Sequence, residues 1–156
     1  MQSTGHGRPA GQGGASGKRW EPVTRYMVPL ARLVTVDAEQ PIETVIDILL
    51  QHGISGAPVT TSQRRLLGII SEKDCLRIIV DHVYHNLPMS SRRVADYMST
   101  QVQTLSQDAD VVVAADTFLA SSVRRLPVVD AEGLLIGQVS RRDILRAARA
   151  MQATTW

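Results

Sequence analysis

The sequence predicts an α/β (α+β) protein of two pseudo-symmetric repeats, each strand-helix-strand-strand-helix, packed together through their sheets. Three observations carry this prediction. When residues 33–77 are shifted by 69 positions, they fall on residues 102–146 without a gap, Thr35 on Thr104. Each copy contains one apolar stripe at helical spacing. Each copy also contains two short aliphatic runs joined by a polar turn, which is typical of paired strands.

The two copies share residue types that chance does not place in one register. The coinciding positions are Pro58 with Pro127, Gly68 with Gly137, Ser71 with Ser140, and Asp74 with Asp143. Just upstream, Val23-x-x-Tyr26-Met27 recurs as Val94-x-x-Tyr97-Met98, now 71 positions apart. The first copy therefore carries two extra residues between positions 28 and 32.

Each copy begins with a short extended segment, over residues 33–36 and residues 102–105, and continues into a helix. The helices are predicted from apolar residues at spacing i, i+3, i+4, i+7, i+8. These residues are Ile42, Val45, Ile46, Leu49 and Leu50 in the first copy, and Val111, Ala114, Ala115, Phe118 and Leu119 in the second. We interpret both stripes as parts of the core. Acidic residues near the helix starts favour the same assignment, because the helix dipole stabilises them there.

The remaining elements of each copy are two strands and a second helix. The strands are predicted over residues 57–60 and 66–70, and again over residues 126–129 and 134–139. The connection Asp130-Ala131-Glu132-Gly133 has the composition of a hairpin turn. Ser71 and Ser140 precede charged residues, so each is predicted to cap a second helix.

The predicted domain organisation follows from the repeats. Residues 1–20 form a Gly- and Ser-rich flexible tail, residues 21–87 the first repeat, residues 88–93 a charged linker, and residues 94–152 the second repeat. A unit of this size buries too little surface to be stable alone, so the two copies are expected to pack together.

The composition narrows the function classes. The 156 residues are 44% hydrophobic but only 4% aromatic, and 17 basic residues nearly balance 15 acidic ones. Nucleic-acid binding is not expected, since the basic residues are scattered and lack stacking aromatics. The single cysteine, Cys75, favours a reducing compartment. No apolar run approaches the ~20 residues that cross a membrane, so we expect a cytoplasmic protein without a membrane partner.

Both copies contain the pattern Gly-x-x-Ser-x-x-Asp, at Gly68–Asp74 and Gly137–Asp143, where a strand runs into a helix. Free backbone N–H groups and the helix dipole favour an anion at such a junction. The Asp carboxylate can accept hydrogen bonds from two adjacent hydroxyls, as of a ribose. The alternative is structural: a capping Ser and a helix-surface Asp, present twice through duplication.

These motifs resemble the tandem CBS domain family, named after cystathionine beta-synthase, in its stand-alone regulatory type. The resemblance rests on Ile54-Ser55-Gly56-Ala57-Pro58-Val59, on Val123 to Asp130, on both Gly-x-x-Ser-x-x-Asp segments and on the Val-x-x-Tyr-Met lead-in. It covers residues 23–151.

The resemblance implies a regulatory adenosyl-ligand sensor that forms a homodimer and signals by conformational change to an unknown protein partner. The ligand would be AMP, ADP, ATP, NAD or S-adenosylmethionine, bound between the repeats, with no cofactor required. The implied ligand-binding residues are Thr35, Ser55, Gly56, Ala57, Ser71, Lys73, Asp74, Thr104, Arg124, Arg125, Leu126, Ser140, Arg141, Arg142 and Asp143. Asp74 and Asp143 match the family's ribose-binding aspartates. The Arg-rich second copy is expected to take a phosphate-bearing ligand first, since Glu72 stands where the second copy has Arg141.

Two other classes stay open. One is an interaction or dimerisation module with empty clefts. The other is an enzyme, which we do not expect, because Ser71 and Ser140 have no histidine at matching positions. We predict no catalytic residue and no metal site: His82 and His85 are read as a solvated helix end, and Cys75 as a small core residue.

Overall fold

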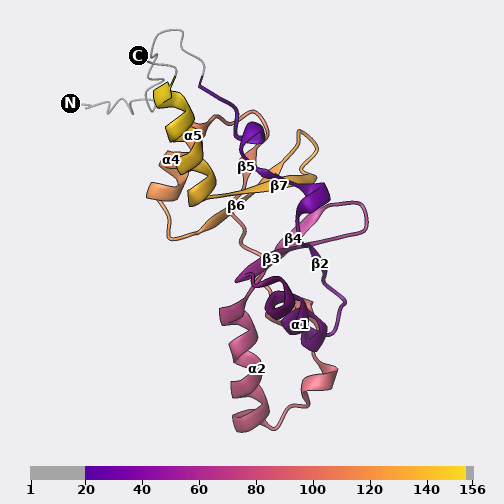
Figure 1. Cartoon of the computed structure of the whole chain (residues 1–156). Coiled ribbons are helices and arrows are strands. Elements are labelled where there is room, and N and C mark those ends of the chain that lie inside the picture. The colour runs from indigo at the N-terminus through magenta and orange to yellow at the C-terminus, as the bar shows by residue number, and fades with distance from the viewer. Residues whose placement is uncertain (1–19, 154–156) are drawn as a thin grey trace, which may run out of the picture.

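The computed structural model describes residues 20–153. The chain forms two lobes whose strands meet in the middle, and whose helices lie on the outer sides (Figure 1). The predicted tail, residues 1–20, lies outside the described residues except for its last position. None of the described helices is both long and apolar enough to cross a membrane.

The first repeat follows the predicted order of elements. It contains β2 (Val36–Asp37), α1 (Ile42–His52), β3 (Gly56–Thr60), β4 (Leu66–Ser71) and α2 (Glu72–His85). The sheet has the order β2-β3-β4, with β2 parallel and β4 antiparallel to β3. Gly53 ends α1 in the left-handed conformation, at a φ of 60°, which glycine adopts without steric cost.

The second repeat has the same architecture. It contains β5 (Leu105–Ser106), α4 (Val111–Leu119), β6 (Arg125–Val129), β7 (Leu135–Ser140) and α5 (Arg141–Ala153). Its strand pairing matches the first repeat residue for residue, with Arg125 opposite Ser140 as Gly56 is opposite Ser71. The mixed α/β fold predicted from the repeats is therefore confirmed.

Two local predictions need correction. The first strand of each copy is only two residues long and lies at the end of the predicted extended segment, because pairing with β3 and β6 begins only at Val36 and Leu105. The apolar stripes are also not entirely core. Leu50 is 74% exposed and Leu119 is 86% exposed, since each lies on the outer side of its helix pair.

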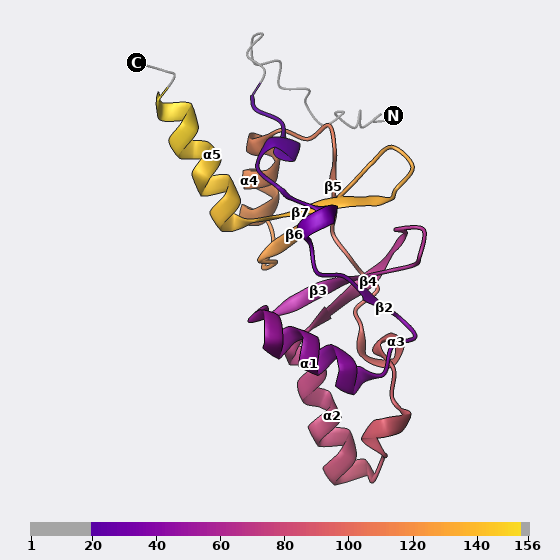
Figure 2. The same ribbon diagram turned by 45° about the vertical axis from the view of Figure 1, so that its right-hand side comes forward.

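The lead-in segments are exchanged between the lobes. The first lead-in forms the 3-10 helix η1 (Val23–Arg25) and strand β1 (Val28–Pro29), which pairs with β7 of the second repeat. Val23 is fully buried in the core of that repeat. The second lead-in, α3 (Val94–Tyr97), follows the 3-10 helix η3 (Met89–Ser91) and lies beside α1 in the first lobe (Figure 2). Each repeat therefore completes the core of the other.

The exchange brings backbone very close to the glycine of each Gly-x-x-Ser-x-x-Asp motif. A Cβ atom at Gly68 would lie 2.5 Å from the backbone oxygen of Ser99, and one at Gly137 would lie 2.6 Å from that of Val28. These distances are shorter than any side chain tolerates, so the motif glycines are required by the packing of the lead-ins.

The two extra residues of the first copy are located by the same pairing. Val28 is paired with Gln138 as Ser99 is paired with Ile69. Five residues, 29–33, separate Val28 from Val34, whereas three, 100–102, separate Ser99 from Gln103, the counterpart of Val34. The longer connection forms the 3-10 helix η2 (Leu30–Arg32), while residues 100–104 contain no helix. The two extra residues therefore lie in the connection that forms η2, and this connection is here called the η2 insertion.

Candidate functional site

The start of α2 is fixed by a capping box. The Ser71 hydroxyl accepts from the backbone N–H of Asp74 at 3.2 Å and donates to Asp74 Oδ2 at 2.8 Å. Asp74 Oδ2 also accepts from the backbone N–H of Ser71 at 2.9 Å. Two backbone donors at the helix start are thereby satisfied, as the capping interpretation of the motif requires.

This cap gives a stability prediction. Ser71→Ala is expected to lower the free energy of unfolding by about 1 kcal/mol, since one capping acceptor of α2 is lost. Urea denaturation followed by circular dichroism measures it. Ser62→Ala, in the exposed turn between β3 and β4, is the control and should change little. Equal stability of both variants would show that the cap does not hold α2.

The start of α5 repeats this geometry with one difference. Asp143 Oδ2 accepts from the Ser140 backbone N–H at 2.8 Å, and the Ser140 hydroxyl accepts from the Asp143 backbone N–H at 3.2 Å. Asp143 Oδ1 accepts from Arg146 Nη1 at 2.8 Å. Asp143 is only 6% exposed and is the one buried charged side chain among the described residues. A buried carboxylate needs such partners, because desolvation disfavours an isolated charge.

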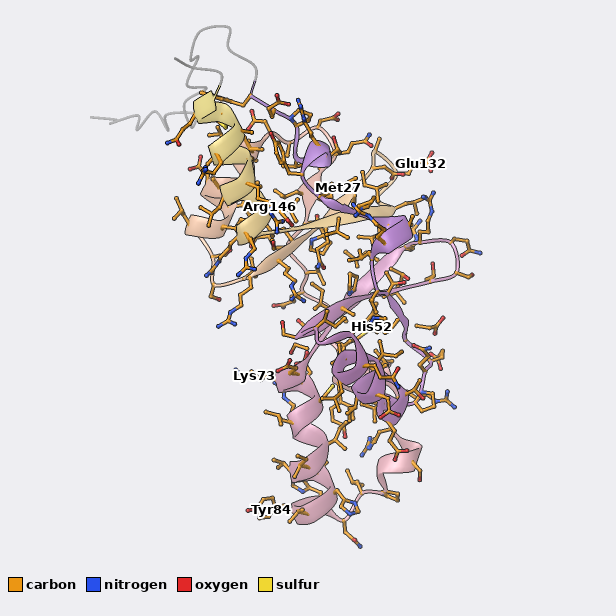
Figure 3. All side chains as sticks on the ribbon, in the orientation of Figure 1. Met27, His52, Lys73, Tyr84, Glu132 and Arg146 are labelled. Carbon is orange, nitrogen blue, oxygen red and sulfur yellow. The ribbon has the colours of Figure 1, made fainter. Side chains whose placement is uncertain are left out.

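Asp143 lies on a cavity of about 290 Å³ between the repeats, here called the Asp143 cleft. This volume is close to the lower end of the roughly 300–1,000 Å³ found for small-ligand sites. The first-repeat side and its lead-in contribute Val28, Arg32, Leu33, Val34, Ile54 and Gly56. The second repeat contributes Arg125, Gln138, Ser140, Arg142, Asp143 and Arg146. Arg146 lies in the second turn of α5, beside the strands of the second repeat (Figure 3).

The Asp143 cleft is strongly basic. Its lining contains four arginines, Arg32, Arg125, Arg142 and Arg146, and one carboxylate, that of Asp143. The Arg146 charge is already matched by Asp143, which leaves three unmatched positive charges. An anionic ligand would therefore bind there in preference to a neutral or cationic one.

A second cavity of about 520 Å³, the Ser71 cleft, adjoins the start of α2. Its lining residues are Ser55, Gly56, Ala57, Ile69, Ser71, Glu72, Lys73, Ser122, Val123, Arg124, Arg125 and Gln138. Gly56, Arg125 and Gln138 line both cavities. The two clefts are therefore neighbours that share a wall.

The shared wall combines unlike residues of the two repeats. Gly56 and Arg125 occupy equivalent positions in the repeats and both line both clefts, so the second repeat contributes a guanidinium to this wall where the first contributes no side chain. Arg125 Nη1 donates to the Gly56 carbonyl at 3.2 Å, which places the guanidinium across the junction. The Ser71 cleft also lacks Asp74 in its lining. The two motifs are alike in sequence but not in surroundings.

The structure brings most of the predicted site residues to these two clefts, and leaves five outside. Asp74 and Thr35 line neither cleft, and Thr104 lines a separate hollow of about 240 Å³. Leu126 is fully buried, because it belongs to the core of the second repeat. The Arg141 guanidinium donates to the Val123 carbonyl at 3.1 Å instead of entering a cleft.

Sequence reasoning missed Arg32, Arg146, Ile54 and Gln138 as cleft residues. For Arg146 a signal was present, since it lies one turn after Asp143 on the same helix face. For Arg32 the signal was the two-residue insertion between positions 28 and 32, which makes the two copies unequal in length.

The Cys75 thiol is buried and lines neither cleft. Burial raises the pKa of the Cys75 thiol above its ordinary value, so this side chain remains a protonated thiol in the core near neutral pH. Within residues 20–153, no three His, Cys, Asp or Glu side chains are grouped so that they could hold a metal ion.

Comparisons with known proteins show the family of this chain. The family model "CBS domain" matches twice, over residues 23–81 and 94–150, so the chain belongs to the CBS domain family as a tandem pair. Among solved structures, CBSX2 from Arabidopsis thaliana is similar at 26% identity with a TM-score of 0.77, covering 88% of this chain and 100% of that one. CBSX2 in complex with AMP has 27% identity and a TM-score of 0.75, covering 85% and 98%.

Relatives of very different length match most of this chain. An uncharacterized protein of Methanocaldococcus jannaschii, MJ1426, is 30% identical, covering 73% of this chain and 84% of the relative. Inosine-5'-monophosphate dehydrogenase of the same organism is 31% identical over 81% of this chain, but the chain spans only 24% of that enzyme. The similarity to that enzyme is therefore confined to a part of it.

Proposed function

We propose that this chain is a regulatory sensor that binds one adenosyl ligand in the Asp143 cleft. The observation that carries the proposal is a buried carboxylate, Asp143, set among guanidinium groups in a cavity between two repeats. The AMP complex of CBSX2, a protein of the same family and fold, supports it.

Each part of the ligand finds matching chemistry in the cleft. The Asp143 carboxylate accepts from the two ribose hydroxyls, and the Ser140 hydroxyl lies beside it. Arg142, in the first turn of α5, holds a phosphate together with the dipole of that helix. Leu33, Val34 and Ile54 supply an apolar wall for the adenine ring.

We propose one high-affinity ligand for each chain. Asp74 does not line the Ser71 cleft, whereas Asp143 lines the other, so only the Asp143 cleft presents the aspartate of its motif to a ligand. Since the Asp143 cleft is lined by residues of both repeats, a ligand stabilises the relative orientation of the lobes that fits it best. Occupancy is thereby converted into a change of shape that a partner can read.

Calorimetric titration of the full chain with AMP, ADP, ATP, NAD and S-adenosylmethionine tests the proposal. Saturable binding of at least one of them, at one site for each chain, is the expected result. If a folded protein binds none of them, the clefts do not serve as adenosyl sites, and an interaction module becomes the better description.

We also propose that the chain forms a homodimer through its outer helix faces. Leu50 and Leu76 in the first repeat and their counterparts Leu119 and Leu145 in the second are all between 60% and 86% exposed. Matching exposed leucines on both helix pairs form two related apolar faces, which monomers rarely leave uncovered. A second copy would cover both faces around a two-fold axis.

Leu119→Asp is expected to convert the dimer largely to monomer, because it places a charge in the apolar contact. Light scattering on a size-exclusion column measures the mass. Gln103→Asp, also exposed but outside these faces, should leave the dimer intact. A wild-type chain that stays monomeric at high micromolar concentration would contradict the proposed assembly.

A further inference from the structure

We infer that the Asp143 cleft selects adenosine diphosphate or triphosphate over AMP and S-adenosylmethionine, and that the η2 insertion creates this selectivity through Arg32. The inference rests on the proposed adenosyl site and specifies its ligand. It begins from a difference between the repeats: η2 has no counterpart at residues 100–104, although the flanking strand pairs are equivalent.

The insertion changes the wall of one cleft only. β1 pairs with β7, whose Gln138 lines the cleft, and this pairing anchors the chain just before η2. η2 then places Arg32 in the lining of the Asp143 cleft, next to Leu33 and Val34. Residues 100–102, the shorter equivalent segment, contribute nothing to the lining of the Ser71 cleft. Arg32 is therefore an additional cation brought to one site by two extra residues.

The charge of the cleft sets the class of ligand. The Asp143 carboxylate forms an ion pair with Arg146 at 2.8 Å. The positive charges of Arg32, Arg125 and Arg142 therefore have no anionic partner in the lining of the cleft. The Arg125 bond to the Gly56 carbonyl satisfies one N–H but does not neutralise the charge. A single phosphate brings about −1.5 to −2 charge near neutral pH, which leaves part of the cationic wall unmatched. A second or third phosphoryl group supplies the remaining negative charge and further acceptor oxygens for bidentate guanidinium groups.

The other adenosyl ligands fit this wall less well. S-adenosylmethionine carries a sulfonium cation where a nucleotide carries phosphate, so it would add a positive charge to three unmatched ones. NAD carries a cationic nicotinamide ring beside its two phosphates, so it brings less net negative charge than ADP to the three unmatched arginines.

Competition between nucleotides, measured by calorimetry on the full chain without divalent cations, tests the inference. ATP and ADP are expected to bind about tenfold or more tightly than AMP, and S-adenosylmethionine to give no saturable heat. A higher salt concentration should weaken the binding of ATP more than the binding of AMP, because salt screens the additional phosphate charges of ATP. In Arg32→Gln, ATP affinity should fall by about tenfold, the loss of one charge-assisted hydrogen bond, while AMP affinity changes by less than about twofold.

The control is Arg149→Gln, which removes an equal charge from an exposed position of α5 outside both clefts and should leave every affinity unchanged. If AMP or S-adenosylmethionine binds as tightly as ATP, or if Arg32→Gln weakens AMP and ATP equally, the selectivity inference is wrong while the adenosyl site stands. If inorganic triphosphate binds as tightly as ATP, the adenosyl site itself fails, and the cleft is only an anion site.

Discussion

Replacing Asp143 with alanine is expected to weaken binding of the adenosyl ligand by at least about 100-fold. The carboxylate is the acceptor proposed for both ribose hydroxyls, and hydrogen bonds to a charged group contribute roughly 1.5–3 kcal/mol each. At about 1.4 kcal/mol for each factor of ten, losing both bonds removes two or more orders of magnitude of affinity. The measurement is a calorimetric titration of the variant with the ligand that binds the wild-type chain best.

Asp74→Ala is the matched control, since it removes the corresponding carboxylate from the capping box of α2. Both variants lose a capping acceptor and should lose similar stability, about 1 kcal/mol. Only Asp143→Ala should lose the ligand, because Asp74 lines neither cleft. If both variants bind equally well, or if Asp74→Ala is the one that fails to bind, the assignment of the ligand to the Asp143 cleft is wrong.

Gly68→Ala is expected to lower the free energy of unfolding by roughly 1–3 kcal/mol, the usual cost of overpacking. The added methyl group would meet the Ser99 carbonyl oxygen at 2.5 Å, and that oxygen belongs to backbone that is itself paired with Ile69. The Ser99 carbonyl can move away from the added methyl group only if the second lead-in detaches from β4. Gly137→Ala should behave alike, since Val28 occupies the equivalent place. Urea denaturation measures both variants.

Gly53→Asn supplies the comparison for these glycine variants. Gly53 has a φ of 60° but nothing within 4 Å of an added Cβ atom, and asparagine tolerates this conformation at a helix end. Its variant should therefore lose much less stability than Gly68→Ala. Wild-type stability of Gly68→Ala would mean that the lead-in does not lie against this strand as described.

The internal repeat predicted the elements well because helical and strand periodicities are local properties. It did not predict the exchange of the lead-ins. Val23 and Val94 are each followed by Tyr and Met three and four positions later, and this pattern fits either core equally well. Only the chain path in space decides which core each one enters. Nor does the apolar stripe from Ile42 to Leu50 reveal that Leu50 is exposed. Helical spacing identifies the apolar face of a helix but not how much of that face the neighbouring elements cover.

The candidate site was partly predictable for the same reason. Ser140 and Asp143 are identified by a motif of fixed spacing, and Arg142 by its place in the first turn of a helix. Arg32 lies far from them in sequence and reaches their cleft only through the pairing of β1 with β7. Leu126 and Arg141 were predicted beside the ligand from the family pattern, but their side chains turn into the core and toward Val123.

A crystal structure of the full chain grown with ADP tests the central claim most directly. We predict one nucleotide for each chain in the Asp143 cleft, with the ribose hydroxyls on the Asp143 carboxylate and the phosphates against Arg142 and Arg32. A nucleotide bound elsewhere, or an Asp143 cleft that stays empty at a saturating ADP concentration, would contradict the account.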